Sequence, residues 1–411
     1  MLDSPTADPA FSSRRNVLSS ARRANSVAFA AQGFFLAVVL TELPQLKSKF
    51  SLNESTLVFL VAGISLIAAG GSVLAERVAA RHSSRAALRL GLHFISLGGL
   101  AAACSPGPVA LFVALGVYGI GLGAVDAGAN MQALLIQHGQ RRFILSSFYA
   151  AWSAGAIGGA LLVASCESLN VPVGAVIGAA AVIVLSAAQI LGPRLPSATN
   201  GESGPDEREC APDVPVRALL LFGAAVALAF AIDLAVGNWS ALYLSEELRA
   251  SAATAALALA AYQGASLAGR LAGDALVRRW GARTVSRCAA GIGAAGLTIV
   301  VAAPVPPVAI IGFLIAGCGL PLIAPLCFSE LGRRTSGRGL DTVIARLNLF
   351  NYAGTLVGGV LVGAVATATS LRTGLLVPLL FALALLGLAR AFPTRHAAAG
   401  GAAGPPGKVV P

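Results

Sequence analysis

The sequence predicts an all-α membrane protein with twelve transmembrane helices in two six-helix halves. Three observations lead to this fold class: the composition, the lengths of the apolar stretches, and the distribution of Lys and Arg between those stretches. Hydrophobic residues make up 56% of the 411 residues and charged residues 11%, whereas soluble proteins contain about 45–50% and about 25%. So few charged side chains cannot cover a water-soluble surface of this size.

Apolar stretches recur along the chain at the length of about 20 residues that a helix needs to cross a hydrocarbon core of about 30 Å. Turn-forming segments such as "SPGP" at 105–108 and "PVPP" at 304–307 separate them. Ser51 and Glu54 have the spacing of a capping box, which predicts the start of the second span. The predicted spans are 26–46, 55–75, 86–104, 109–136, 143–166, 172–192, 217–240, 252–276, 284–303, 307–329, 342–366 and 372–392.

The basic residues predict the orientation of these spans. An even number of spans places both termini on the same side of the membrane. With the termini inside, all but four of the 29 Lys and Arg residues fall on that side, the exceptions being Lys47, Lys49, Arg249 and Arg372. Because Lys and Arg mark cytoplasmic loops, we expect a multi-pass protein of the cell (inner) membrane with cytoplasmic N- and C-termini.

A polar interruption divides the spans into the two halves. Gly119 and Gly121 in the first half align with Gly317 and Gly319, 198 positions later. Parallel repeats of this kind are typical of secondary transporters. The predicted parts are a cytoplasmic N-terminal tail (1–25), a first half (26–192), a cytoplasmic linker (193–216), a second half (217–392) and a cytoplasmic C-terminal tail (393–411).

Several other classes of protein are not expected. The net charge of +11 does not indicate a nucleic-acid partner, because the charges occur in short clusters without a basic face. The six cysteines include no Cys-x-x-Cys and the four histidines no His-x-x-x-His, so we expect no metal site, no cofactor and no enzyme activity. The segment "GIGLGAVDAGANMQ" (119–132) matches a nucleotide-binding glycine pattern, but it follows no predicted strand and lies inside a span.

Five segments carry a resemblance to a known family: "LPQLKSKFSLNE" (43–54), "GLGAVDAGANMQ" (121–132), "AWSAGAIGGAL" (151–161), "GNWSALYL" (237–244) and "GRLAGDALVRRWGAR" (269–283). With the two six-span halves, they resemble the major facilitator superfamily, and more narrowly its bacterial YbjJ-like inner-membrane branch, distantly allied to fucose permease-like sugar carriers. The resemblance covers nearly the whole chain and implies transport by alternating access.

The chain departs from the superfamily's usual motifs at two places. In the loop after the second span, Glu76 and Arg77 keep the acid–base pair, but Ser72 and Ala79 replace both glycines. The fourth span carries Asp126 where drug antiporters of the superfamily have an Arg motif. Asp126, together with the absence of a Pro from "GAIGGA" (155–160) in the fifth span, favours a transporter other than a drug antiporter without excluding one.

Asp126 is the first candidate site residue. A charge at membrane depth is costly and should face a cavity or a partner. Gly119, Gly123, Asp126 and Asn130 lie on one helical stripe, so an Asp beside an Asn on a glycine-cleared face is a candidate for binding a proton, a cation or a polar substrate. The alternative is a buried ion pair with an inner-loop arginine, Arg77 or Arg81.

Asp233 in the seventh span is the second candidate. A carboxylate inside a span can take up and release a proton, so we expect it to act in proton coupling or substrate binding. The alternative is a hydrogen bond that holds helices together.

Further polar residues lie in spans that the superfamily resemblance places around a central cavity. Amides and aromatic rings in such a cavity suit a sugar-like or amphipathic ligand, although each residue alone can be a packing residue. These candidates are Gln32, Tyr149, Trp152, Gln263, Asn348, Asn351 and Tyr352.

Charged loops after the second span of each half predict an inner gate. Their cations would pair with acids or helix C-termini and so hold one conformation, although the same arginines can serve only to fix the topology. The predicted gate residues are Glu76, Arg77, Arg81, Asp274, Arg278, Arg279 and Arg283.

The sequence as a whole therefore predicts a secondary active transporter of a small polar or amphipathic solute, coupled to protons. Its expected partners are the solute, protons and the lipid bilayer, without nucleic acid, and the expected oligomeric state is a monomer. A multidrug or metabolite efflux antiporter and a non-transporting membrane sensor are the alternatives.

Overall fold

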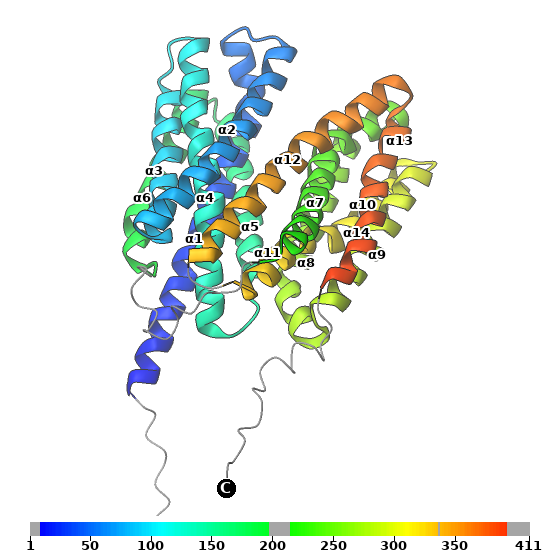
Figure 1. The fold of residues 1–411 in the computed structure, drawn as a ribbon. Helices are drawn as coiled ribbons and strands as arrows, with labels where there is room; N and C mark the ends of the chain where they lie inside the picture. Colours follow the sequence, from blue (N-terminus) through cyan, green and yellow to red (C-terminus); the bar gives the residue numbers. More distant parts are fainter. Residues whose placement is uncertain (1–8, 197–213, 336–337, 393–411) are drawn as a thin grey trace, which may run out of the picture. The chain divides into compact units, whose positions relative to one another are not determined.

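The computed structural model describes residues 9–196, 214–335 and 338–392, and all regular elements in these ranges are helices (Figure 1). The predicted all-α fold class is confirmed. Most of the predicted linker and the whole predicted C-terminal tail lie outside the described residues, as do residues 1–8.

The first half of the sequence forms six long helices, each matching one predicted span. The first of them starts well before the predicted position and contains Pro44. The helices are α1 (Pro9–Lys49), α2 (Glu54–Arg81), α3 (Ser84–Ala103), α4 (Pro108–Gln140), α5 (Leu145–Ser168) and α6 (Val173–Leu191), followed by the short 3-10 helix η1 (Gly192–Arg194).

The second half forms helices that match the other six predicted spans, two of which are interrupted. The predicted span 307–329 is divided by a 3-10 turn at Leu320–Leu322, because Pro321 lacks the backbone N–H that a continuous helix uses. The helices are α7 (Val216–Leu242), α8 (Ala252–Trp280), α9 (Ala282–Ala302), α10 (Pro306–Gly319), α11 (Ile323–Arg333), α12 (Arg338–Ala368), α13 (Leu371–Gly374) and α14 (Leu376–Leu388), with the 3-10 helix η5 (Ala389–Ala391) at the end.

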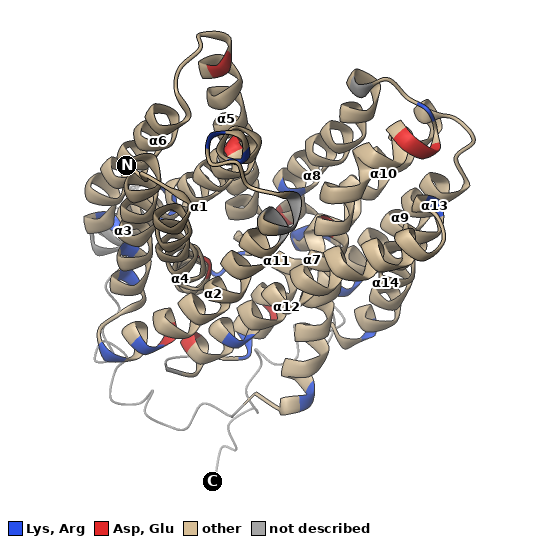
Figure 2. Ribbon diagram, turned by 90° about the horizontal axis from the view of Figure 1, so that it is seen from above, with Lys and Arg blue, Asp and Glu red and all other residues tan. Residues whose placement is uncertain are grey.

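Eleven helical segments among the described residues are long and apolar enough to cross a membrane. The predicted eighth span forms the continuous helix α8 but is not one of the eleven. Polar residues such as Gln263, Arg270 and Asp274 make this helix less apolar than a typical membrane span. Figure 2 shows how sparsely acidic and basic residues occur on the other helices.

The chain divides into two compact units. The first unit contains Met1–Leu219 and Leu331–Leu356, and the second contains Leu220–Glu330 and Val357–Pro411. Helix α12 therefore contributes its first part to one unit and its second part to the other. The predicted domain boundaries stay a prediction.

Matching glycines bring helices together in the same way within each unit. A Cβ added to Gly119 on α4 would lie 3.1 Å from the carbonyl oxygen of Ile64 on α2, and one added to Gly317 on α10 would meet the carbonyl oxygen of Tyr262 on α8. Ile64 and Tyr262 are separated by the same 198 positions as the two glycines. The internal repeat predicted from these glycines thus appears as a repeated helix contact.

The predicted capping box at the start of α2 is wrong. The N-cap residue is Asn53, whose side chain accepts a hydrogen bond of 2.7 Å from the backbone N–H of Thr56. Asn is as good an N-cap residue as Ser, and the helix starts with Glu54 as its first residue.

Candidate functional site

The carboxylate of Asp126 meets two neutral donors within the first unit. Gln32 Nε2 on α1 donates to Asp126 Oδ1 at 2.5 Å, and the Tyr352 hydroxyl on α12 donates to Oδ2. The alternative partners considered from the sequence, Arg77 and Arg81, have exposed side chains. Among the described residues, the partners of Asp126 are thus an amide and a phenol and not an arginine.

Asn130 extends this arrangement by one helical turn. Its Nδ2 donates to the Asp126 backbone carbonyl at 2.9 Å, and its Oδ1 accepts a hydrogen bond of 3.3 Å from the Tyr149 hydroxyl on α5. The structure therefore brings together five of the predicted residues, from helices α1, α4, α5 and α12: Gln32, Asp126, Asn130, Tyr149 and Tyr352.

Two unpaired donors accompany this group. Tyr118 on α4 is 1% exposed and interacts electrostatically with Asp126. Its hydroxyl and Asn348 Nδ2 on α12 are buried without a hydrogen-bond partner among the described residues. Tyr118 was not predicted as a site residue, although its position two turns before Asp126 on the same helix is a signal that could have found it.

Ser72 gives a physical reason for one departure from the superfamily motif. Its hydroxyl on α2 donates to the Gly123 carbonyl on α4 at 3.0 Å, and it also interacts with Tyr352. The serine that replaces a motif glycine thus links α2 to α4 beside the Asp126 group.

The glycine-cleared face predicted around Asp126 is not open space. A Cβ added to Gly123 would meet the carbonyl oxygen of Ala68 on α2, and Gly119 also lies against this helix. The prediction of a cleared face is wrong, because the two glycines allow the backbones of α2 and α4 to approach closely.

Asp233 has a different environment within the second unit. Its Oδ2 lies 3.5 Å from Arg270 Nη2 on α8, and its Oδ1 accepts a hydrogen bond from the Tyr262 hydroxyl. The Arg270 side chain is 6% exposed and that of Asp233 28%. The sequence did not predict this pair, because Arg270 was counted only among the Lys and Arg residues on the cytoplasmic side of the membrane.

The other predicted cavity residues have varied positions. Trp152 on α5 is half-buried, Gln263 on α8 is exposed and Asn351 on α12 is buried. The Asn351 backbone carbonyl accepts a hydrogen bond of 3.0 Å from Thr355. The described contacts do not connect these residues directly to the hydrogen bonds of Asp126 or Asp233.

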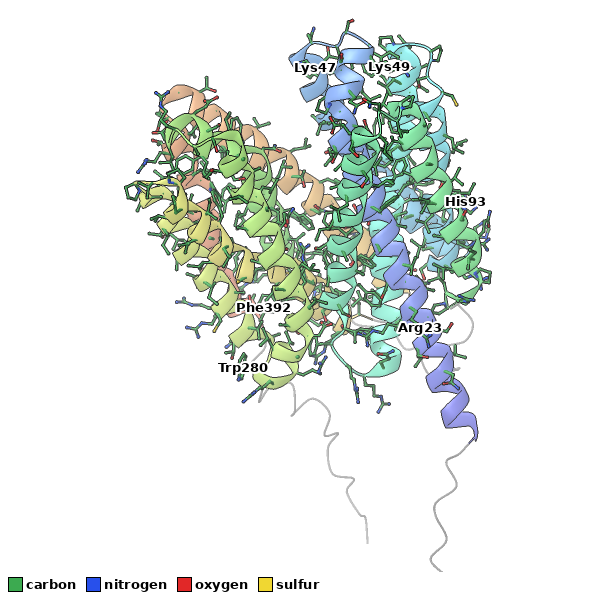
Figure 3. The ribbon with its side chains drawn as sticks, turned by 180° about the vertical axis from the view of Figure 1, so that it is seen from behind. Arg23, Lys47, Lys49, His93, Trp280 and Phe392 are labelled. Carbon is green, nitrogen blue, oxygen red and sulfur yellow. The ribbon has the colours of Figure 1, made fainter. Side chains whose placement is uncertain are left out.

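The predicted gate residues also differ among themselves. Glu76 is half-buried and Asp274 is buried, whereas four arginines are exposed: Arg77, Arg81, Arg278 and Arg279. Arg283 on α9 donates from Nε to the Phe392 carbonyl at 2.5 Å and from Nη2 to the Arg390 carbonyl at 2.9 Å. Arg283 thus binds the carbonyls that follow α14; Figure 3 labels Phe392 and Trp280 in this part of the second unit.

The chain is similar to known membrane transporters. A model of the Major Facilitator Superfamily matches residues 220–409. The uncharacterised transporter y4wD of Sinorhizobium fredii (strain NBRC 101917 / NGR234) is 27% identical over 378 residues, which cover 88% of this chain and 95% of y4wD. An uncharacterised MFS-type transporter of Yersinia pestis is 25% identical over 348 residues, which cover 84% of this chain and 88% of that protein.

Solved transporter structures share the fold. FucP of E. coli in its outward conformation matches with a TM-score of 0.75 at 19% identity, over 90% of this chain and 98% of FucP. The proton:xylose symporter XylE matches with a TM-score of 0.75 at 14% identity, over 93% of this chain and 97% of XylE.

These similarities and the helical membrane fold define a membrane transporter, not an enzyme. The chain is a multi-pass transporter of the major facilitator superfamily, distantly similar to FucP. The resemblance to the superfamily predicted from the sequence is confirmed, while the narrower YbjJ-like branch stays a prediction.

Proposed function

We propose that the protein is a proton-coupled secondary transporter of a small polar or amphipathic solute, and that Asp126 is the residue that binds the proton. The observation that carries this proposal is the set of partners around its carboxylate. Gln32 and Tyr352 are both neutral, and no cation among the described residues pairs with Asp126. A carboxylate held in this way can gain a proton without breaking an ion pair.

Protonation of Asp126 would reverse one hydrogen bond. The phenol of Tyr352 now donates to Oδ2, but a protonated carboxyl group has an O–H of its own, and the phenolic oxygen can accept it. Asp126 belongs to α4 and Tyr352 to α12. Proton binding would therefore change the bond that links these two helices, which gives a direct connection between protonation and helix movement in alternating access.

The solute class rests on the groups beside Asp126. Tyr118 Oη and Asn348 Nδ2 are buried donors without a described partner, and such donors are costly to bury unless something accepts from them. A solute with hydroxyl or carbonyl oxygens would supply those acceptors. Within the same unit, Trp152 and Tyr149 add aromatic surface on α5 and Asn351 adds an amide, as an amphipathic or sugar-like solute requires.

The similar transporters support this proposal. FucP is a fucose:proton symporter and XylE a proton:xylose symporter. Both combine a polar, hydroxyl-rich solute with proton coupling, within the fold that this chain shares.

Asp233 has a different proposed role. Arg270 already balances its charge at 3.5 Å, so proton uptake there would disrupt a partly buried ion pair. We place Asp233 and Arg270 in solute binding or in holding one transport state. The charged residues from Glu76 to Arg81 and from Asp274 to Arg283 serve as the inner gate in this proposal, in a monomer of the inner membrane with cytoplasmic termini.

Transport in inverted membrane vesicles tests the proposal. Uptake and efflux across a panel of sugars, polyols and amphipathic metabolites would be measured with and without an imposed pH gradient, for the wild type, Asp126→Asn and Asp233→Asn. We expect Asp126→Asn to lose gradient-driven accumulation by at least tenfold while keeping exchange of the solute. Asp233→Asn should lower flux with and without the gradient alike.

Two results would contradict the proposal. If Asp126→Asn accumulates the solute with the wild-type dependence on the pH gradient, Asp126 does not bind the coupled proton. If no solute moves under any gradient, a sensor is favoured over a transporter of these solutes.

A further inference from the structure

A group of polar residues outside the Asp126 site lies between α3 and α6 in the first unit. His93 Nδ1 donates to the Arg89 backbone carbonyl at 2.6 Å, and Gln189 Nε2 lies 3.3 Å from His93 Nε2. Because a carbonyl only accepts hydrogen bonds, the nitrogen that faces the Arg89 carbonyl is the donor, and Nε2 faces the Gln189 amide. Gln189 is exposed, and His93 lies on the flank of the unit (Figure 3).

Two arginines continue this group toward the start of α3. Arg85, Arg89 and His93 follow one another at intervals of four residues and so share one face of the helix. Arg89 lies against Gly192 at the end of α6, where an added Cβ would be 2.7 Å from Arg89 Nε. A glycine at this position therefore lets the guanidinium approach the backbone.

These two guanidinium groups have no protein partner in the part of the chain that the structure describes. Arg89 Nε is buried without a hydrogen-bond partner, and neither arginine forms a hydrogen bond or ion pair there through its side chain. Arginine carries five N–H donors and keeps its charge. The two side chains therefore present unused donors and positive charge at one place.

The matching place in the second unit shows the contrast. Arg283 on α9 occupies the position of Arg85, 198 residues later, and it donates to the carbonyls of Phe392 and Arg390 after α14. The second unit thus satisfies this arginine from its own chain. The described residues of the first unit do not satisfy Arg85 in this way, although Leu195 ends η1 with the same extended backbone as Phe392 ends η5.

Exposed apolar side chains continue the same surface away from the arginines. Leu97, one turn beyond His93 on α3, is 57% exposed, and Val182 and Ile183 on α6 are 50% and 51% exposed. Along these two helices the surface passes from apolar side chains to the neutral donors and acceptors of His93 and Gln189, and then to the two arginines. A phospholipid has the same order of acyl chains, ester groups and phosphate.

We propose that the surface formed by Arg85, Arg89, His93, Gln189 and Leu97 is a binding site for an anionic phospholipid. The arginines bind the phosphate and the charged headgroup, Gln189 donates to an ester oxygen, and the acyl chains lie along the apolar side chains. Basic pockets between transmembrane helices bind anionic headgroups by this combination of charge and apolar contact. The proposal depends on the chain spanning a membrane and not on the identity of the transported solute.

Lipid titration of the purified full-length protein in a neutral detergent tests the proposal. Phosphatidylglycerol and phosphatidylcholine with the same acyl chains would be compared by the thermal unfolding midpoint and by the number of lipids retained in native mass spectrometry. We expect phosphatidylglycerol to act at concentrations at least tenfold lower than phosphatidylcholine. Arg85→Gln/Arg89→Gln should lower this preference roughly tenfold, which corresponds to about 1.4 kcal/mol, and retain one phosphatidylglycerol molecule fewer.

Arg287→Gln is the matched control. Arg287 is the counterpart of Arg89 on α9 and is exposed, so its loss should leave the preference unchanged. If the double variant also loses its response to phosphatidylcholine, Arg89→Lys replaces it, and this variant should keep the preference because the charge remains. The proposal is overturned if the wild type shows no preference, if the double variant keeps it, or if Arg287→Gln removes it equally.

Discussion

In the first unit the carboxylate of Asp126 meets two neutral donors, Gln32 and Tyr352, whereas in the second unit Asp233 meets the guanidinium of Arg270 as well as the hydroxyl of Tyr262. The helix packing of the units does not show this difference. Each unit packs its fourth span against its second and third through matching glycines. A shared packing pattern thus carries two different electrostatic environments.

The difference separates two physical roles. A buried ion pair is stable only while both partners remain, since removal of one leaves an uncompensated charge. A carboxylate with neutral donors can instead change its protonation state and keep its neighbours. The comparison therefore favours a fixed contact at Asp233 and a variable charge at Asp126. These are the roles proposed above, with proton binding at Asp126 and solute binding or the holding of one transport state at Asp233.

The largest expected effect comes from breaking the pair in the second unit. Arg270→Gln leaves the Asp233 carboxylate without its cation, and we expect a loss of about 3 kcal/mol in the free energy of unfolding. The double variant Arg270→Gln/Asp233→Asn should recover most of this loss, because no buried charge remains. Denaturant unfolding of the full chain in one detergent measures both changes.

Two comparisons make this prediction specific. Arg287→Gln, at an exposed arginine of the same unit, should change stability by no more than about 0.5 kcal/mol. Lowering the pH should relieve part of the Arg270→Gln loss, because Asp233 can then take up a proton. Equal losses in the single and double variants would show that the two side chains are not coupled.

The second prediction compares how closely the matching glycines pack against the neighbouring helix in the two units. A Cβ at Gly317 would meet the Tyr262 carbonyl more closely than a Cβ at Gly119 meets that of Ile64, which lies 3.1 Å away. We expect Gly317→Ala to cost about 2–3 kcal/mol and Gly119→Ala about 1 kcal/mol or less. Thermal unfolding of the two variants in the same detergent checks this order.

Gly116→Ala is the control for these variants. Its added Cβ would have Ile67 Cδ1 as its nearest atom, at 3.7 Å, which is ordinary contact. Its stability should stay the same or rise slightly, because Ala favours a helix by about 1 kcal/mol over Gly. Equal losses at Gly119 and Gly317 would mean that the repeated contact is equally tight in both units.

Sequence reasoning found the fold and much of the Asp126 group for identifiable reasons. An apolar stretch of helix length predicts a transmembrane helix by itself, and a charged residue within such a stretch is conspicuous because a charge is costly inside the membrane. Gln32 and Tyr352, which contact Asp126, were candidates because they are polar residues in spans that the superfamily resemblance places around a central cavity, and their roles stay predictions.

Sequence reasoning missed three features of the two sites: the partner of Asp233, the close packing at the glycines near Asp126, and Tyr118. Arg270 lies 37 positions after Asp233, and a basic residue near a helix end is explained equally well by topology. The glycines around Asp126 were read as clearing space, but a glycine pattern alone does not tell an open face from a closely packed one. Tyr118 was overlooked because a single tyrosine in an apolar span is usually a packing residue.

The smallest expected effect compares the two tyrosine hydroxyls. Tyr352→Phe leaves Asp126 with Gln32 as its remaining donor, whereas Tyr262→Phe leaves Asp233 with Arg270. Both hydroxyls donate to a carboxylate, and a hydrogen bond to a charged group contributes about 1.5–3 kcal/mol. If Asp126 is charged in the folded state, Tyr352→Phe should cost about 1 kcal/mol more than Tyr262→Phe, because Asp126 keeps only a neutral amide donor whereas Arg270 still balances the charge of Asp233.

Tyr118→Phe is the matched control, because its hydroxyl has no described hydrogen-bond partner. It should be close to neutral in thermal unfolding without solute, and it should weaken solute binding if that hydroxyl donates to the solute. Measuring the three variants at two pH values extends the comparison. The excess loss in Tyr352→Phe should shrink at the lower pH if Asp126 takes up the proton there, whereas the Tyr262→Phe loss should not change. An excess that is the same at both pH values would remove the distinction between a variable charge in the first unit and a fixed pair in the second.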